Sequence, residues 1–158
     1  MQDEDFDLKK EYEVLKKRYN LPSFKDLDRE FDIAEIEHDG FLLRRIRGRI
    51  YDKVDFFIKI LESILYPNSA NMASLYESKF FSEYDMDECT NILKRLMFID
   101  RSYILLDVEE DEGKDADFIK DVFKEWQSLK NDLLKFLKIM KDSWKKEEKM
   151  PGEKEYFG

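Results

Sequence analysis

Apolar residues recur every three or four positions along most of this chain, which is the spacing that one face of an α-helix requires. The longest regular run lies between Gly40 and Pro67. Its apolar positions are Leu43, Ile46, Ile50, Val54, Phe57, Leu61 and Leu65. The run predicts one amphipathic helix over residues 41–65, roughly 40 Å long.

Gly48 interrupts this predicted helix near its middle. A glycine inside a helix costs about 1 kcal/mol relative to alanine. We therefore expect a neighbouring element to approach the helix closely at this position, where a side chain would obstruct the contact.

Two further stretches carry the same helical period. Residues 83–107 follow a capping-box pattern formed by Ser82 and Asp85. Their apolar stripe is Met86, Cys89, Leu93, Leu96, Ile99, Tyr103 and Leu106. Residues 117–148 form the third stretch, with the stripe Phe118, Val122, Trp126, Leu129, Leu133, Phe136, Met140 and Trp144. Both patterns predict long amphipathic helices.

Shorter elements precede and connect the long helices. Residues 3–19 predict one helix, and Ser23 with Asp26 begins a second, short one. Residues 68–81 predict a connection with one helical turn at 72–77. Residues 109–117 are mainly acidic around Gly113 and predict a solvated turn.

These elements predict an all-α fold. Three long helices form an antiparallel bundle, and one or two shorter N-terminal helices close its open side. We expect a single domain over residues 1–149 and a flexible C-terminal tail over residues 150–158.

The composition is typical of a helical protein and limits the cellular compartments in which we expect it. The chain has 158 residues, a net charge of −9, five glycines and three prolines, so few turns are expected. One cysteine cannot form an internal disulfide, and no apolar run is long enough to span a bilayer. We expect a soluble cytoplasmic protein that does not bind membranes. Abundant Lys and Glu also resemble the composition of thermophilic proteins.

No residue pattern in the chain predicts catalysis. Glu35 and His38 have the E-x-x-H spacing that di-iron helical bundles use twice, but His38 is the only histidine and lies at a predicted helix break. Cys89 lies on an apolar stripe, where a free cysteine is normally a small buried hydrophobe. We expect a protein that is not an enzyme and has no cofactor.

The acidic segment does not match an EF-hand. A loop that starts at Asp107 would place Glu112 where glycine is required and Phe118 where the final glutamate is required. No glycine-rich phosphate-binding motif occurs either. We predict no metal site.

Two basic features are candidates for phosphate contacts. The last predicted helix carries a lysine stripe within about a third of its circumference: Lys124, Lys135, Lys138, Lys141 and Lys145. The run from Arg44 to Arg49 does not form one patch, because Arg44 and Arg45 point away from the core while Arg47 and Arg49 flank it on opposite sides. The alternative for the lysine stripe is an ordinary solvated face, which the negative net charge favours.

Four aromatic residues do not fit one helical stripe: Tyr76, Phe80, Phe81 and Tyr84. They either cover an end of the bundle as a satellite core or form a surface for a partner. Adjacent Phe80 and Phe81 cannot both face the same stripe, so one of them is the better candidate for an exposed contact.

The sequence thus favours a non-enzymatic helical interaction protein, an adaptor or assembly subunit that binds a protein partner or a second copy of itself. The alternative is a nucleic-acid-associated protein that uses the lysine stripe, with Arg44, Arg45 and Arg49 as additional phosphate contacts.

Overall fold

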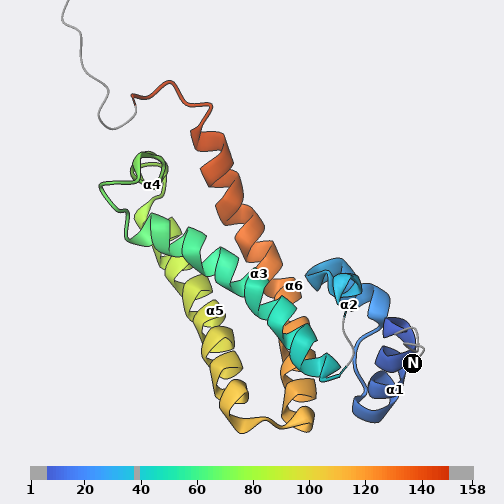
Figure 1. Ribbon diagram of the computed structural model, residues 1–158. Coiled ribbons are helices and arrows are strands. Elements are labelled where there is room, and N and C mark those ends of the chain that lie inside the picture. Colours follow the sequence, from blue (N-terminus) through green and yellow to red (C-terminus); the bar gives the residue numbers. More distant parts are fainter. Residues whose placement is uncertain (1–6, 38–39, 150–158) are drawn as a thin grey trace, which may run out of the picture. The chain divides into compact units, whose positions relative to one another are not determined.

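The computed structural model describes residues 7–37 and 40–149 (Figure 1). These residues form α-helices and one short 3₁₀-helix, and no strand occurs among them. The elements are α1 (Leu8–Tyr19), α2 (Phe24–Phe31), η1 (Ile33–Glu35), α3 (Leu42–Leu65), α4 (Met72–Ser78), α5 (Glu83–Glu109) and α6 (Glu112–Ser143). The predicted all-α fold class is confirmed.

Side-chain caps fix the starts of several helices, as the sequence predicts. The Ser23 hydroxyl accepts the Asp26 amide at 3.1 Å at the start of α2. Before α5, the Ser82 amide donates to the Asp85 carboxylate at 2.9 Å, and the Asp85 amide donates to the Ser82 hydroxyl at 3.1 Å. This reciprocal pair is the predicted capping box, and it satisfies amide donors that have no partner within the helix.

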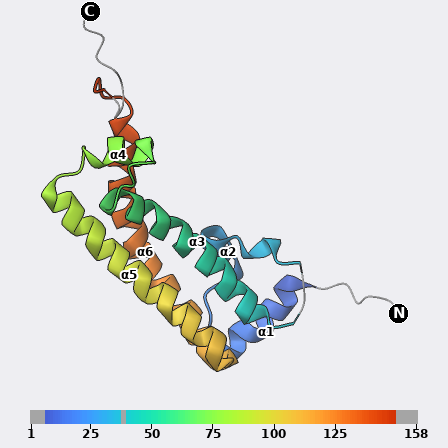
Figure 2. The same ribbon diagram turned by 60° about the vertical axis from the view of Figure 1, so that its left-hand side comes forward.

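The chain divides into two compact units, and each of the long helices α3, α5 and α6 contributes one part to each unit. Figure 1 and Figure 2 show these helices from two directions. Unit 1 comprises Met1–Asp55 and Phe98–Gln127, and unit 2 comprises Phe56–Met97 and Ser128–Gly158. The single domain over 1–149 and the antiparallel arrangement of the whole bundle stay predictions. The predicted tail at 150–158 lies outside the described residues.

Unit 1 buries the first half of the predicted α3 stripe against α2, α5 and α6. Leu43, Ile46, Ile50 and Val54 are all buried. The rings of Phe31 in α2 and Trp126 in α6 lie 5.6 Å apart, and the indole Nε1 of Trp126 donates to the buried Glu30 carboxylate at 2.8 Å. The hydrogen bond gives the buried indole N–H a partner, and the Glu30 carboxylate also pairs with Arg29 at 3.5 Å.

Unit 2 has its own apolar core, made by the other halves of the long helices. Its members are Ile58, Leu61, Ile64, Cys89, Ile92, Leu96, Leu129, Leu133 and Phe136. The sequence prediction was wrong at one edge of α3, because Ile58 and Ile64 are buried where Phe57 and Leu65 were expected. Phe57 is adjacent to Ile58, and Leu65 is adjacent to Ile64. All four residues are apolar, so the helical period alone did not determine which residue of each pair faces the core.

The acidic segment is structured differently from the prediction. Only Glu110 and Asp111 separate α5 from α6, and Glu110 has a left-handed backbone with φ of 51°. The Asp111 carboxylate accepts the Lys114 amide at 3.0 Å, which caps α6. Most of the predicted turn over 109–117 is therefore helix, because this aspartate starts α6 earlier than the apolar pattern indicates.

The C-terminal end of α6 also differs from the prediction. The helix ends at Ser143 rather than near Lys149. The hydroxyl of buried Tyr76 donates to the Ser143 carbonyl at 2.7 Å, which satisfies one of the last carbonyl groups of the helix. This long-range contact could not be read from the local sequence.

Candidate functional site

The four aromatic candidates separate into buried and exposed residues. Tyr76 and Phe81 are buried in unit 2, where Tyr76 lies 4.6 Å from the Trp144 ring and Phe81 stacks on Phe136 at 4.5 Å. Phe80 is half-buried and contacts Tyr76 edge-on at 5.1 Å. Only Tyr84 is largely exposed, at 71 %. These contacts agree with the satellite-core alternative for Tyr76 and Phe81, and they leave Tyr84 as the accessible member.

The lysine stripe is solvent-exposed. Lys124, Lys135, Lys138 and Lys141 lie on α6, whereas Lys145 follows the helix end. Among the described residues, no carboxylate forms an ion pair with any of these five side chains. The charges are accessible, but this is also true of an ordinary solvated helix face.

The three arginine candidates do not share one location. The Arg44 guanidinium lies 5.1 Å from the Phe41 ring centre and 3.9 Å from Glu110. Arg45 and Arg49 instead line one pocket beside α3. The structure therefore brings two of these three arginines together and separates the third.

Arg47 lies at a position that the sequence did not predict. We expected it at the flank of the core, but it is 0 % exposed. Its Nη2 lies 2.9 Å from Asp107 and its Nε lies 3.0 Å from Asp115. Its Nη1 donates to the Tyr103 carbonyl at 3.1 Å, and the guanidinium lies 4.6 Å from the Tyr103 ring centre. A buried charge needs such partners, and two of them lie in or beside the segment expected to be a solvated turn.

The two carboxylates of this cluster, Asp107 and Asp115, lie in different environments. Burial raises the pKa of the Asp115 carboxyl above its ordinary value, although the nearby Arg47 opposes the shift. Asp107 remains about half exposed. The cluster joins α3 to α5 and α6 within unit 1. Because Arg47 is enclosed by these groups, the arrangement fits a structural role better than contact with a substrate.

Cys89 and the Glu35–His38 pair are the remaining chemical candidates. Cys89 is fully buried, and burial raises the pKa of its thiol to about 12, so the nucleophilic thiolate is disfavoured. Within residues 7–37 and 40–149, no three His, Cys, Asp or Glu side chains are grouped to hold a metal ion. His38, the second member of the Glu35–His38 pair, lies outside the described residues.

An exposed apolar face lies on the C-terminal half of α5, in unit 1. Phe98, Leu105 and Val108 are 77 %, 57 % and 80 % exposed, and Ile104 is also exposed. The spacings of seven and three residues place the first three on one side of the helix. The apolar stripe predicted for this helix lies on the opposite face of α5 and includes the core residues Ile99 and Leu106. The second face was missed, although the same helical period could have indicated it.

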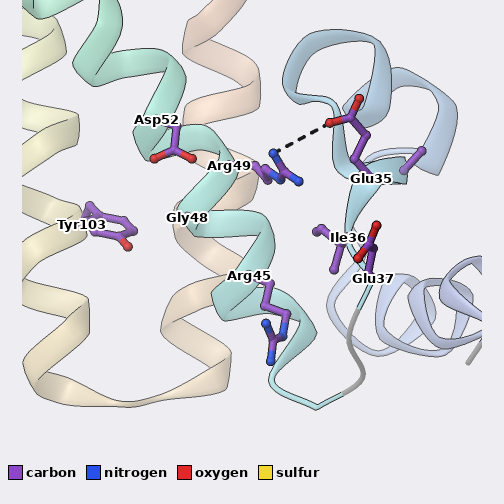
Figure 3. A pocket seen from close by; sticks show the side chains of 9 residues that line it. Glu35, Ile36, Glu37, Arg45, Gly48, Arg49, Asp52 and Tyr103 are labelled. Atoms are coloured by element: carbon purple, nitrogen blue, oxygen red, sulfur yellow. Dashed lines mark ion pairs between the residues drawn. The ribbon is translucent and has the colours of Figure 1, made fainter.

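A pocket of unit 1 lies between α3 and the segment at 34–37 and has a volume of about 730 Å³ (Figure 3). Its α3 wall carries Arg45, Gly48, Arg49 and Asp52. The opposite wall includes Glu35, Ile36 and Glu37, and the Arg49 side chain is directed toward Glu35 (Figure 3). Tyr103 of α5 also lines the pocket.

Comparison with known proteins assigns no family. No family model, curated protein or solved structure is significantly similar to this chain. None of the described helices is both long enough and apolar enough to cross a membrane.

Proposed function

We propose that this protein is a non-enzymatic interaction protein that assembles with a second copy of itself through the exposed apolar face of α5. The observation that carries the proposal is the exposure of Phe98, Leu105 and Val108 on one side of a single helix. Each large apolar side chain left in water forgoes about 1.5–3 kcal/mol of burial. Several exposed apolar side chains on one side of a helix are typical of a binding surface.

The symmetry of the contact supports a second copy as the occupant. An antiparallel pair of α5 helices brings Phe98 of each copy toward Val108 of the other, so both copies use the same face. Charge does not select the occupant, because the exposed Arg101 on this side already pairs with Asp100 at 2.5 Å. The acidic residues beyond the face also have partners within the chain: Glu109, Glu110 and Glu112 pair with Lys114, Arg44 and Arg18.

The face is small, so we expect association in about the micromolar range rather than a permanent dimer. The test is the molar mass of the protein over a range of concentrations, measured by light scattering after size exclusion. The wild type should form dimers, and the variant Phe98→Ser/Val108→Ser should remain monomeric. Both side chains are exposed, so these changes should leave the melting temperature almost unchanged.

Val14→Ser is the matched control, since Val14 is an apolar residue of unit 1 that is 58 % exposed on α1. It should dimerise like the wild type. A dimer that survives the two α5 changes would mean that another surface is responsible. A wild type that is monomeric up to about millimolar concentration would exclude self-association.

The alternative function is nucleic-acid association through the lysine stripe, and the exposure of its five side chains supports it. The net charge of −9 opposes it, so we expect weak or no binding near physiological salt. Binding that falls steeply with salt and disappears when Lys135, Lys138, Lys141 and Lys145 are changed to Glu would favour this alternative. Tight binding that survives those changes would place the nucleic-acid surface elsewhere.

A further inference from the structure

The pocket beside α3 contains a glycine that packing does not explain. We expected Gly48 to allow a close helix contact, and this interpretation is wrong. A Cβ built on Gly48 would meet only the Tyr103 hydroxyl, at 4.0 Å, which is an ordinary contact distance. Alanine would therefore fit, and it would favour the helix more than glycine does. The missing side chain instead leaves the α3 backbone open along the pocket wall.

Two guanidinium groups lie to one side of this opening. Arg45 and Arg49 are four residues apart and so lie on the same face of α3, whereas Gly48 is turned by about 60° from Arg45 and about 100° from Arg49 around the helix. The Arg45 Nε donates to the Gly40 carbonyl at 3.1 Å, and among the described residues no carboxylate pairs with its terminal nitrogens. Arg49 lies 4.0 Å from Glu35, and both side chains are partly exposed, so this pair is weak.

The Tyr103 hydroxyl supplies a neutral donor on the α5 side of the pocket, next to Gly48 (Figure 3). The ring is held by stacking on Tyr51, with the ring centres 4.3 Å apart. Burial is the main cause that raises the pKa of the Tyr103 hydroxyl, so this group keeps its proton at neutral pH. Two guanidinium groups and a hydroxyl donor are the groups that recognise a phosphate or carboxylate.

The pocket also carries acidic side chains. Glu35, Glu37 and Asp52 line it together with the two arginines. A simple anion would meet these carboxylates as well, whereas a ligand with an additional amino group would complement both sets of charges. The volume of about 730 Å³ is within the usual range for small-molecule sites.

We propose that this pocket binds a small zwitterionic ligand, whose phosphate or carboxylate lies against Arg45 and Arg49 beside the open surface at Gly48 and whose amino group faces Glu35 and Glu37 on the opposite wall. The site is separate from the apolar face of α5, so it does not depend on self-association.

The test uses the full chain labelled with ¹⁵N and three probes: phosphoethanolamine, β-alanine and inorganic phosphate. The amide signals of residues 45–49 and the Nε–H signals of Arg45 and Arg49 should shift on titration. Phosphoethanolamine or β-alanine should bind at roughly millimolar concentration, and inorganic phosphate at least about ten-fold more weakly, because it lacks the amino group. Shifts with phosphoethanolamine alone would identify a phosphate ligand, and shifts with β-alanine alone a carboxylate ligand.

Variants locate the site. Arg45→Gln/Arg49→Gln should abolish the shifts, whereas Arg29→Gln, an exposed arginine of α2, should preserve them. Gly48→Leu should weaken binding at least about ten-fold. Gly48→Ala should raise the melting temperature by about 2–4 °C, which shows that packing does not require the glycine.

Three results would overturn the proposal. The first is no shift with either zwitterion at about 10 mM, which is well above the expected affinity. The second is binding that survives Arg45→Gln/Arg49→Gln, because the ligand would then lie elsewhere. The third is full affinity in a folded Gly48→Leu protein, because the open surface at Gly48 would then have no part in the site.

Discussion

Arg47 illustrates at the residue scale how a charged side chain is placed inside this fold. The helical period predicted the direction of the Arg47 side chain only approximately, and the charge of this side chain indicated a position at the surface. Its burial depends on Asp107, Asp115 and Tyr103, which are more than 50 residues away in sequence. No local pattern contains that information. By contrast, Cys89 was correctly predicted to be buried because its apolar neighbours repeat regularly.

The raised pKa of Asp115 makes the stability of unit 1 depend on pH. The folded protein holds this proton more tightly than the unfolded chain does, so the contribution of Asp115 to the free energy of unfolding falls as pH rises above its ordinary pKa of about 4. In Asp115→Asn this slope is absent. Urea unfolding between about pH 3.5 and pH 6 should therefore show the wild type losing stability relative to the variant. Parallel curves for the two proteins would contradict the raised pKa.

Cys89 should react slowly with thiol reagents while the protein is folded. Its side chain is fully buried and its pKa is raised to about 12, so both access and thiolate formation are suppressed. At mildly alkaline pH we expect alkylation by iodoacetamide at least about 100-fold slower than in urea-unfolded protein, measured by mass spectrometry. Equal rates in the two states would show that the thiol is accessible.

At the element scale, α5 has two apolar faces with different roles. One packs inside the units through residues such as Leu96, which is fully buried. Leu96→Ala should reduce the free energy of unfolding by about 2–5 kcal/mol, because it leaves a cavity in unit 2. Chemical denaturation followed by circular dichroism measures this change. Leu105→Ala, at an exposed position, is the control and should reduce the free energy of unfolding far less. Equal reductions for the two variants would mean that the two faces of α5 do not differ in burial.

The elements also show what sequence can predict. The existence of all three long helices followed from their apolar period, and Ser23 and Ser82 were recognisable as caps. The end of α6 was not predictable, because it depends on the Tyr76 hydroxyl from α4. The pocket at Gly48 was not predictable either, since it requires the segment at 34–37 and Tyr103 to lie beside α3. Local signals therefore determine the helices, whereas the candidate sites depend on contacts between them.

At the scale of the whole molecule, three surfaces were candidates for binding a partner: the aromatic residues at 76–84, the lysine stripe and the exposed face of α5. Aromatic residues 76 and 81 are used in packing, and the lysine stripe is opposed by the overall charge of the protein. The exposed apolar side chains of α5 are the surface on which our proposal of a protein partner rests. We propose a second copy as the occupant because an antiparallel contact would use the same face on both copies.

The most direct test is a cross-link at the centre of the proposed contact. Leu105→Cys in a Cys89→Ser background places one thiol on the exposed face of α5, and in an antiparallel pair the two copies of this thiol lie close to the two-fold axis. A short bis-maleimide should then yield a cross-linked dimer that disappears when Phe98→Ser and Val108→Ser are added. Gln127→Cys, an exposed position on α6, is the control and should remain monomeric. Equal cross-linking at residues 105 and 127, or none at 105 in concentrated protein, would contradict assembly through α5.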